Sequence, residues 1–313
     1  MAKAFFRTVT GDVPVDSLGM VLPHEHLFMD HRGLENDGFA QEDPELVRKM
    51  MVPYLKRAEK AGVTALFECS PIGIGRNIGI LTGLAMETKI KIIAPTGIFS
   101  EKFTPVLYKH NSEENLVKLW VEEIEKGIGF TEHKAGFIMI AISEGGPTEL
   151  EQRNIRAAAK TSLATGAAIA SFTPEGEVAL AELELLKTEG LNPSKLIWLH
   201  ANGEKDPKYH FQMADQGAYV EFDCLGRTDG PTDPICEGIA GLMGKGLAKH
   251  ILLSQGAGAF QLGAPNGIPE KGIRGYTDLT SQLIPLLKSQ GLDDATLRLL
   301  TEDNPKRAYT LLK

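Results

Sequence analysis

The segment Met20-Val-Leu-Pro-His-Glu-His26 is a short apolar run that ends in two histidines. Similar runs recur along the chain and alternate with longer stretches of 3.6-residue periodicity. The other runs are Thr64–Cys69, Ile92–Gly97, Gly136–Ile142, Ala167–Phe172, Leu196–His200, Ala218–Phe222 and His250–Ser254. Eight strand–helix alternations in a chain of 313 residues predict an α/β fold, a closed (β/α)8 TIM barrel.

The stretches between these runs have the pattern of amphipathic helices. Glu45–Ala61 places Leu46, Met50 and Tyr54 on one stripe, which predicts the face that packs on the barrel. Leu150–Leu163 and Val178–Leu186 show the same period. Glycines that end helices follow several of these stretches: Gly62, Gly166, Gly190 and Gly217.

The chain has no composition change that would mark a second domain, so we expect one barrel over residues 1–313. Residues 3–19 are expected to form an N-terminal strand pair, and residues 302–313 a closing helix that begins at Asn304-Pro305. An open doubly wound sheet is the alternative architecture. No glycine-rich dinucleotide fingerprint follows the first run, which favours the barrel.

Composition excludes several classes of function. The net charge of −8 gives no basic face for nucleic acid. No apolar run approaches the roughly 20 residues that span a bilayer, and the N-terminus does not resemble a signal peptide. Three cysteines, Cys69, Cys224 and Cys236, are too few for a disulfide framework and fit a reducing compartment. We therefore expect a cytoplasmic protein that binds neither nucleic acid nor membrane.

The two histidines of the first run lie two residues apart, so on a strand both face the same side. Other segments fall at matching intervals: Arg7-Thr-Val-Thr-Gly-Asp12, Gly75-Arg-Asn77, Thr96-Gly97, Ala135-Gly-Phe-Ile138 and Asn304-Pro305. With these segments, essentially the whole chain resembles the phosphotriesterase family of the amidohydrolase superfamily, which includes lactonases. The resemblance implies a TIM barrel hydrolase.

The resemblance also implies six metal-ligand positions at the carboxyl ends of the strands. The His-x-His pair is present as His24 and His26, and the sixth strand keeps its histidine as His200. The carbamylated lysine of the fourth strand, the histidine of the fifth and the aspartate of the eighth are replaced, by Met139, Phe172 and Gly256. Both anionic ligands are missing, so the sequence predicts that the two-metal centre of the family is lost.

We therefore expect no cofactor, and histidine acid–base catalysis at the barrel mouth. His200 is the first candidate for the general base, with His24 and His26 as further base, acid or oxyanion donor. A single zinc ion on the same three histidines stays open as an alternative. An additional carboxylate could come from Asp30, Glu144 or Asp223, whereas Glu25 should face away from its neighbouring histidines.

Substrate-binding candidates lie around the same strand ends: Met139, Phe172, Arg76, Arg227, Cys224 and Gln255. Loops 97–111, 227–234 and 257–275 are expected to set specificity. The leading hypothesis is a metal-independent hydrolase of a lactone or similar activated ester, a small-molecule substrate. A relative without turnover that binds a ligand, and a single-zinc hydrolase, are the alternatives. The resemblance also implies a homodimer.

Overall fold

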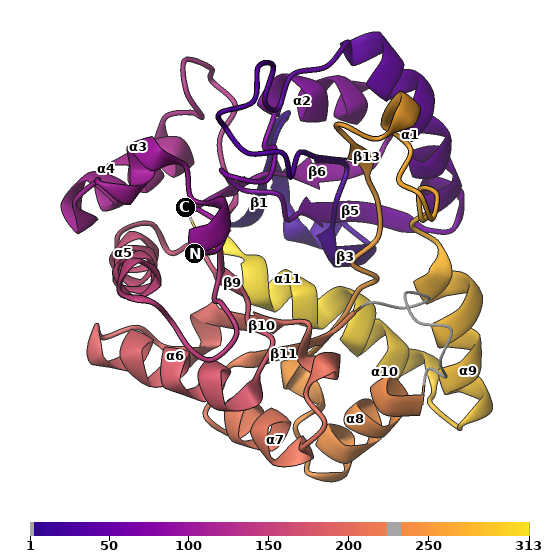
Figure 1. Ribbon diagram of the computed structural model, residues 1–313. Coiled ribbons are helices and arrows are strands. Elements are labelled where there is room, and N and C mark those ends of the chain that lie inside the picture. The colour runs from indigo at the N-terminus through magenta and orange to yellow at the C-terminus, as the bar shows by residue number, and fades with distance from the viewer. Residues whose placement is uncertain (1–2, 224–232, 313) are drawn as a thin grey trace.

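The computed structural model describes residues 3–223 and 233–312. Parallel strands form the barrel, in chain order: β3 (Met20–Glu25), β5 (Val63–Glu68), β6 (Lys91–Ile93), β7 (Pro95–Thr96), β8 (Phe137–Ala141), β9 (Ile169–Phe172), β10 (Leu196–Leu199), β11 (Tyr219–Phe222) and β12 (Ile251–Leu253). Each strand pairs with the next along this series, except that β6 does not pair with β7 and β12 does not pair with β3. The predicted TIM barrel is confirmed (Figure 1).

Each of these two interruptions in the strand pairing has a local cause. The predicted strand 92–97 is divided into β6 and β7 just before Pro95, whose nitrogen cannot donate to a ladder. Between β12 and β3 the barrel closes beyond the ends of the regular ladder, where the Gly256 amide donates to the His24 carbonyl at 3.0 Å. The Ser254 hydroxyl also donates to the His24 carbonyl, at 3.0 Å. Closure therefore places a histidine of the first strand directly against the eighth.

Helices surround the barrel as an outer ring (Figure 1). They are α1 (Pro44–Lys60), α2 (Ile78–Met86), α3 (Val106–Lys109), α4 (Glu113–Glu125), α5 (Glu149–Thr165), α6 (Gly176–Thr188), α7 (Pro207–Asp215), α8 (Asp233–Gly244), α9 (Ile284–Ser289), α10 (Asp294–Arg298) and α11 (Asn304–Tyr309). Helix α5 shows both expected end signals, a capping box at Thr148 and Glu151 and a left-handed Gly166 after its last turn. None of the helices in the described ranges is both long and apolar enough to cross a membrane.

Helix α1 corrects one detail of the sequence analysis. Its fully buried stripe is Val47, Met51, Leu55 and Ala58, whereas the predicted stripe of Leu46, Met50 and Tyr54 is only partly buried beside it. Both stripes are apolar and adjacent on the helix surface, about 100° apart. The pattern therefore predicts the helix correctly but not the centre of its buried face.

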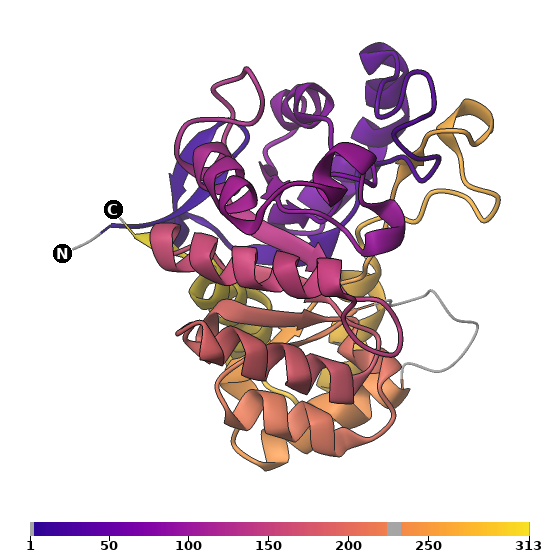
Figure 2. The same ribbon diagram turned by 60° about the vertical axis from the view of Figure 1, so that its left-hand side comes forward.

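The two chain ends meet at the bottom of the barrel. Strand β1 (Ala4–Thr8) pairs antiparallel with β2 (Gly11–Pro14) and with β14 (Leu311–Leu312). Figures 1 and 2 show the termini side by side. The C-terminal helix does not begin at Asn304-Pro305 as expected, because α10, a π-helical segment over Leu299–Asp303 and α11 follow one another without a break. It ends at Tyr309, before the expected residue 313, and the chain then extends to pair with β1. A further short pair joins β4 (Phe28–Met29) to β13 (Phe260–Gln261) above the first strand.

The barrel interior is filled by its own apolar cluster, separate from the layer between strands and helices. Phe6, Phe67, Phe137 and Tyr309 pack as an aromatic group inside it. Met139 also lies in this interior cluster and is 1% exposed. Because this packing closes the lower barrel, polar chemistry is confined to the carboxyl ends of the strands.

Candidate active site

His24, His26 and His200 converge at the carboxyl ends of β3 and β10. The Nε2 atoms of His24 and His26 are 3.3 Å apart. The ring centroids of His24 and His200 are 4.8 Å apart, with the rings edge to face. Residues separated by more than 170 positions therefore meet in one cluster, as the strand-end positions of the three histidines predict.

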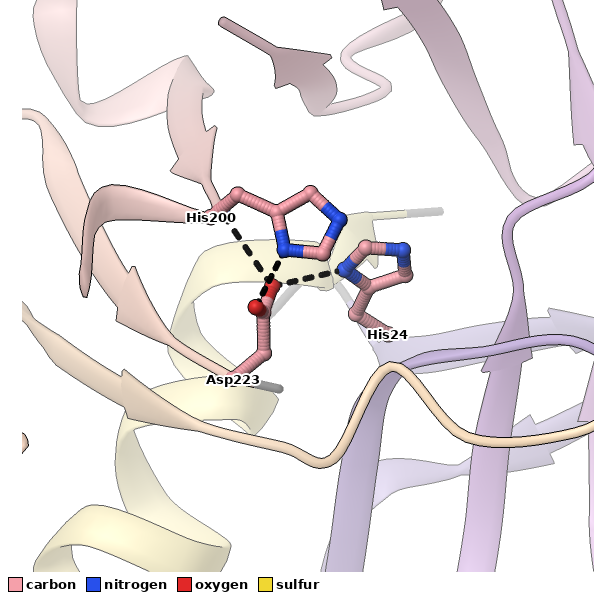
Figure 3. A group of neighbouring side chains, drawn as sticks. All are labelled: His24, His200 and Asp223. Atoms are coloured by element: carbon pink, nitrogen blue, oxygen red, sulfur yellow. Dashed lines mark hydrogen bonds and ion pairs between the residues drawn. The ribbon is translucent and has the colours of Figure 1, made fainter. Parts of the chain in front are cut away.

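Asp223, directly after β11, joins two of these histidines (Figure 3). One carboxylate oxygen is 2.9 Å from Nδ1 of His24, and the other lies within hydrogen-bonding distance of Nδ1 of His200. Asp223 is fully buried, but its contacts with the two imidazoles hold the pKa of its carboxyl well below the usual range. An ionised carboxylate only accepts hydrogen bonds, so both histidines donate their Nδ1 hydrogen to it.

His200 stands in an unusual backbone conformation. Its φ angle of 59° lies in the left-handed region, and its amide donates to Asp223 at 3.1 Å. Such conformations cost free energy in residues other than glycine and persist where the surroundings impose them, often at functional sites. The edge of Phe172 packs against the ring, with centroids 4.7 Å apart at 88°. The His200 side chain is 14% exposed and that of His24 only 1%, so His200 is the more accessible of the two.

His26 is held by a different group. Its Nδ1 is 3.0 Å from the hydroxyl of Ser70, which follows β5 and is fully buried. Ser70 in turn donates its amide to Glu68 at 3.1 Å. Each of the three histidines is therefore fixed through Nδ1.

Buried carboxylates lie beneath and beside the histidines. Glu221 lies in β11, two residues before Asp223, and one of its oxygens is 3.9 Å from Nδ1 of His24. Burial, and then the negative charge of Asp223, raise the pKa of Glu221 well above its usual value. Burial also raises the pKa of Glu25 to about 7. As expected, Glu25 points away from the histidines and accepts hydrogen bonds from Ser254 and the amides of Gln255 and Ala257.

Two of the substrate-binding candidates have their polar groups engaged elsewhere. The Arg76 guanidinium, 7% exposed, forms two 2.6 Å contacts with Glu123. Gln255 is fully buried, and its side-chain oxygen accepts the Leu279 amide at 3.1 Å. We therefore leave Arg76 and Gln255 out of the proposed site.

The remaining candidates have varied placements. Phe172 touches the histidine cluster, and Met139 lies in the barrel interior. Cys224 and Arg227 lie outside the described residues. Of the candidate carboxylates other than Asp223, Asp30 pairs with Arg32 at 2.9 Å and Glu144 is exposed on a loop.

The donor set can be tested against the metals that the resemblance implies. Two divalent ions carry four positive charges, whereas Met139, Phe172 and Gly256 contribute neither an anion nor an imidazole. Asp223, the ionised carboxylate of the described cluster, already accepts from two imidazoles. The described residues therefore do not fit a two-ion centre.

A single zinc ion fits this donor set better than two ions do. Two ligands of a tetrahedral zinc ion at about 2.0–2.1 Å are separated by roughly 3.3 Å, the distance between Nε2 of His24 and of His26. Histidines that bind metal through one nitrogen usually have the other held by a carboxylate or another acceptor. One nitrogen each of His24 and His200 and one oxygen of Asp223 lie within 4.8 Å of one another, and in this group Asp223 serves as such an acceptor.

Sequence reasoning named Asp223 as one carboxylate among several and did not name Ser70, Glu68 or Glu221. The signal was present, because Ser70 follows the second strand and Glu221 shares a strand face with Asp223. However, the distance from Ser70 to His26 depends on how far one strand extends beyond its neighbour. The shift in pairing between Leu22 and Glu25 cannot be read from the hydrophobic pattern.

Comparison with known proteins identifies the family of the chain. The profile of the phosphotriesterase family matches residues 4–309. A phosphotriesterase homology protein of Escherichia coli is 30% identical, covering 94% of this chain and 99% of that protein. A phospho-furanose lactonase of Mycoplasmopsis synoviae is also 30% identical, covering 98% and 92%. The solved structure of an organophosphorus hydrolase from Deinococcus radiodurans superposes with a TM-score of 0.90 at 26% identity, covering 98% and 97%. The chain therefore belongs to the phosphotriesterase family.

Proposed function

We propose that this protein hydrolyses a lactone or a similar activated ester without a metal ion, with His200 as the general base. The family and its lactonase members support a hydrolase that acts on ester bonds. The observation that carries the finer proposal is the pairing of His200 with the buried carboxylate of Asp223. Because Nδ1 of His200 donates to Asp223, Nε2 carries the lone pair that a base needs.

The reaction needs a base, a donor for the developing oxyanion and a proton for the leaving oxygen. Nε2 of His200 removes a proton from water as the water oxygen attacks the carbonyl carbon. The carboxylate of Asp223 stabilises the resulting imidazolium, as in other histidine–aspartate pairs. When the ring C–O bond breaks, the imidazolium returns its proton to the departing alkoxide.

The paired histidines would supply the donor. Protonation of the pair places a hydrogen on Nε2 of His24 or of His26, which lie 3.3 Å apart, and that hydrogen can be donated to a negative oxygen instead of to the neighbouring nitrogen. Apart from the buried carboxylates, the surroundings include apolar side chains, with Met139 in the barrel interior and Phe172 in contact with His200. A low dielectric strengthens a hydrogen bond to an oxyanion. A lactone suits this arrangement, because its carbonyl needs less electrophilic assistance than a phosphotriester.

A single-zinc hydrolase is the second candidate, and the 3.3 Å separation of Nε2 of His24 and of His26 favours it. His24, His26 and His200 would hold the ion, which would supply Lewis acidity and lower the pKa of water. In that case Asp223 and Ser70 would orient the ligands through Nδ1.

Chelation separates the two candidates. The protein should be purified without added metal, its zinc, manganese and cobalt content measured, and a panel of lactones and carboxylic esters assayed with and without chelator. We expect turnover that survives chelation. Activity lost in chelator and restored by zinc would instead identify the single-zinc enzyme. Absence of turnover in both conditions would identify a family member that binds without catalysis.

A further inference from the structure

The turn after β10 carries His200 beyond the end of the regular strand pairing. The registered pairs between β10 and β11 end at Trp198 and Val220. His200 then takes its left-handed φ of 59°, and a single 3-10 turn over Ala201–Gly203 leads the chain out of the strand. Pairing with β11 therefore does not extend to His200.

Two reciprocal hydrogen bonds join the two strand ends beyond this ladder. The His200 amide donates to the Asp223 carboxylate at 3.1 Å, and the Asp223 amide donates to the side-chain oxygen of Asn202 at 2.9 Å. A backbone amide only donates, so the oxygen of the Asn202 side chain, and not its nitrogen, faces Asp223. Asp223 thus holds the backbone of His200, and Asn202 holds the backbone of Asp223.

The Asp223 amide needs an acceptor at this place. Asp223 is fully buried, and a buried amide without an acceptor costs free energy comparable to a lost hydrogen bond. The ladder to β10 has already ended, and on the other side of β11 the Ser254 amide donates to the carbonyl of Phe222 at 3.1 Å. Asn202 therefore supplies an acceptor where pairing with β10 no longer does.

Helix α7 holds the same turn independently. Nε2 of His210 lies 2.7 Å from the Ala201 carbonyl, and because a carbonyl only accepts, His210 is the donor. His210 is buried, and its ring packs against aromatic rings of β10 and β11. The turn therefore keeps a second anchor when the side chain of Asn202 is replaced, and we expect such variants to fold.

We propose that Asn202 is a positioning residue, which accepts the Asp223 amide and so holds the left-handed turn of His200 against the Asp223 carboxylate. The inference rests on the proposed function for its effect on the rate, because His200 is the proposed base. The hydrogen bond itself can be measured without turnover. Sequence analysis did not name Asn202, since its side chain acts on the backbone of a neighbouring strand.

The first test is hydrogen–deuterium exchange, resolved by residue, in chelator-treated protein. Asn202→Leu keeps the approximate shape of the side chain but removes the acceptor, whereas Asn202→Asp keeps an oxygen there. We expect Asn202→Leu to speed exchange of the Asp223 amide about 10-fold, and Asn202→Asp to exchange like the parent. The amides of Ile197 and Trp198, inside the β10 ladder, should not change in either variant.

Two exchange results would overturn the inference. Equal acceleration at Asp223, Ile197 and Trp198 would mean a general loss of stability, and no acceleration at Asp223 would mean that its amide does not depend on Asn202. Asn202→Ala, which leaves room for a water molecule beside the amide, replaces the leucine variant if that protein folds poorly. The same local acceleration is expected of it.

The matched control is Asn192→Leu. The Asn192 side-chain oxygen also accepts a backbone amide, that of Ser194 at 3.0 Å, but it precedes β10 at the opposite end of the barrel. Asn192→Leu should change neither exchange at Asp223 nor turnover. If the parent hydrolyses esters, Asn202→Leu should lower kcat about 10- to 100-fold with little change in KM, the usual cost of misplacing a catalytic group.

Asn202→Asp should recover most of that rate. Local acceleration of exchange at Asp223 with an unchanged kcat would overturn the positioning role, because the site would work equally well without the Asn202 acceptor. A parent without turnover, but with the expected exchange in all variants, would count against the proposed function alone.

Discussion

His200 combines a left-handed backbone, a buried carboxylate on Nδ1 and an accessible ring. Its catalytic role is best tested by His200→Asn, because asparagine adopts φ near 59° more readily than alanine. We expect kcat for lactone or ester hydrolysis to fall by about 10²–10⁴-fold, the usual contribution of a general base. Folding, followed by circular dichroism and thermal unfolding, should change little.

The control for this residue is His133→Asn. His133 precedes β8, at the opposite end of the barrel, and its Nδ1 contacts the Val9 carbonyl at 2.8 Å. The kcat of the His133→Asn variant should match that of the parent. An unchanged rate in His200→Asn would remove His200 from the mechanism and leave His24 and His26 as the remaining candidates.

For individual residues, the sequence could identify the three histidines as neighbours, because the strand ends meet at one face of a barrel. It could not assign hydrogen-bond partners among them. The Asp223 carboxylate reaches both His24 and His200, and Ser70 reaches His26, only because of the stagger between adjacent strands. Nor could it show that Arg76, a loop candidate for substrate binding, pairs with the buried Glu123.

Among the helices, α6 buries a carboxylate against the barrel, and this gives a prediction for stability. One oxygen of Glu182 accepts from Thr173 at 2.9 Å, and the other is buried without a hydrogen-bond partner in the described structure. Burial raises the pKa of Glu182 from 4.5 to about 7. The folded state therefore binds this proton more tightly than the unfolded state, so its stabilising contribution is full below pH 4.5 and is lost as pH rises through 7.

Glu182→Gln should remove this loss. Relative to the parent, the variant should gain roughly 3 kcal/mol of unfolding free energy between pH 4.5 and pH 8, measured by urea denaturation at both pH values. Glu184→Gln is the control on the same helix, because that side chain is 58% exposed. An identical difference between parent and Glu182→Gln at both pH values would contradict the expected titration.

The sequence predicted which segments are strands and which are helices, but not the buried face of α1 or the end of α11. Alternation of short apolar runs with 3.6-residue periods predicted the strands and helices, and Gly166 ended α5 as expected. The sequence could not show which of two adjacent apolar stripes on α1 is buried, because both fit the period. Nor did it predict that α11 would end at Tyr309. The residues that follow form β14, which pairs with β1, and this pairing depends on contact between the two ends of the chain.

For the whole molecule, the central question is whether the barrel still accepts the metal centre of its family. The positions are available, since Met139 lies inside the barrel and Phe172 contacts His200. Gly256 has a φ of 53°, a region that aspartate tolerates better than most residues. The combined variant Met139→Lys, Phe172→His and Gly256→Asp should therefore fold and bind two divalent ions per chain in bicarbonate, whereas the parent should bind at most one.

The reason is charge, and a second variant isolates it. Met139→Gln, Phe172→His and Gly256→Asn restores similar shapes and the same imidazole but neither anion. Metal content after equilibration with zinc, measured by elemental analysis, should be two ions per chain for the first variant and one or none for the second. Two ions in both would show that the missing imidazole, not the missing negative charge, had excluded the pair. One ion or none in both would mean that Met139, Phe172 and Gly256 do not stand at the ligand positions that the family resemblance implies.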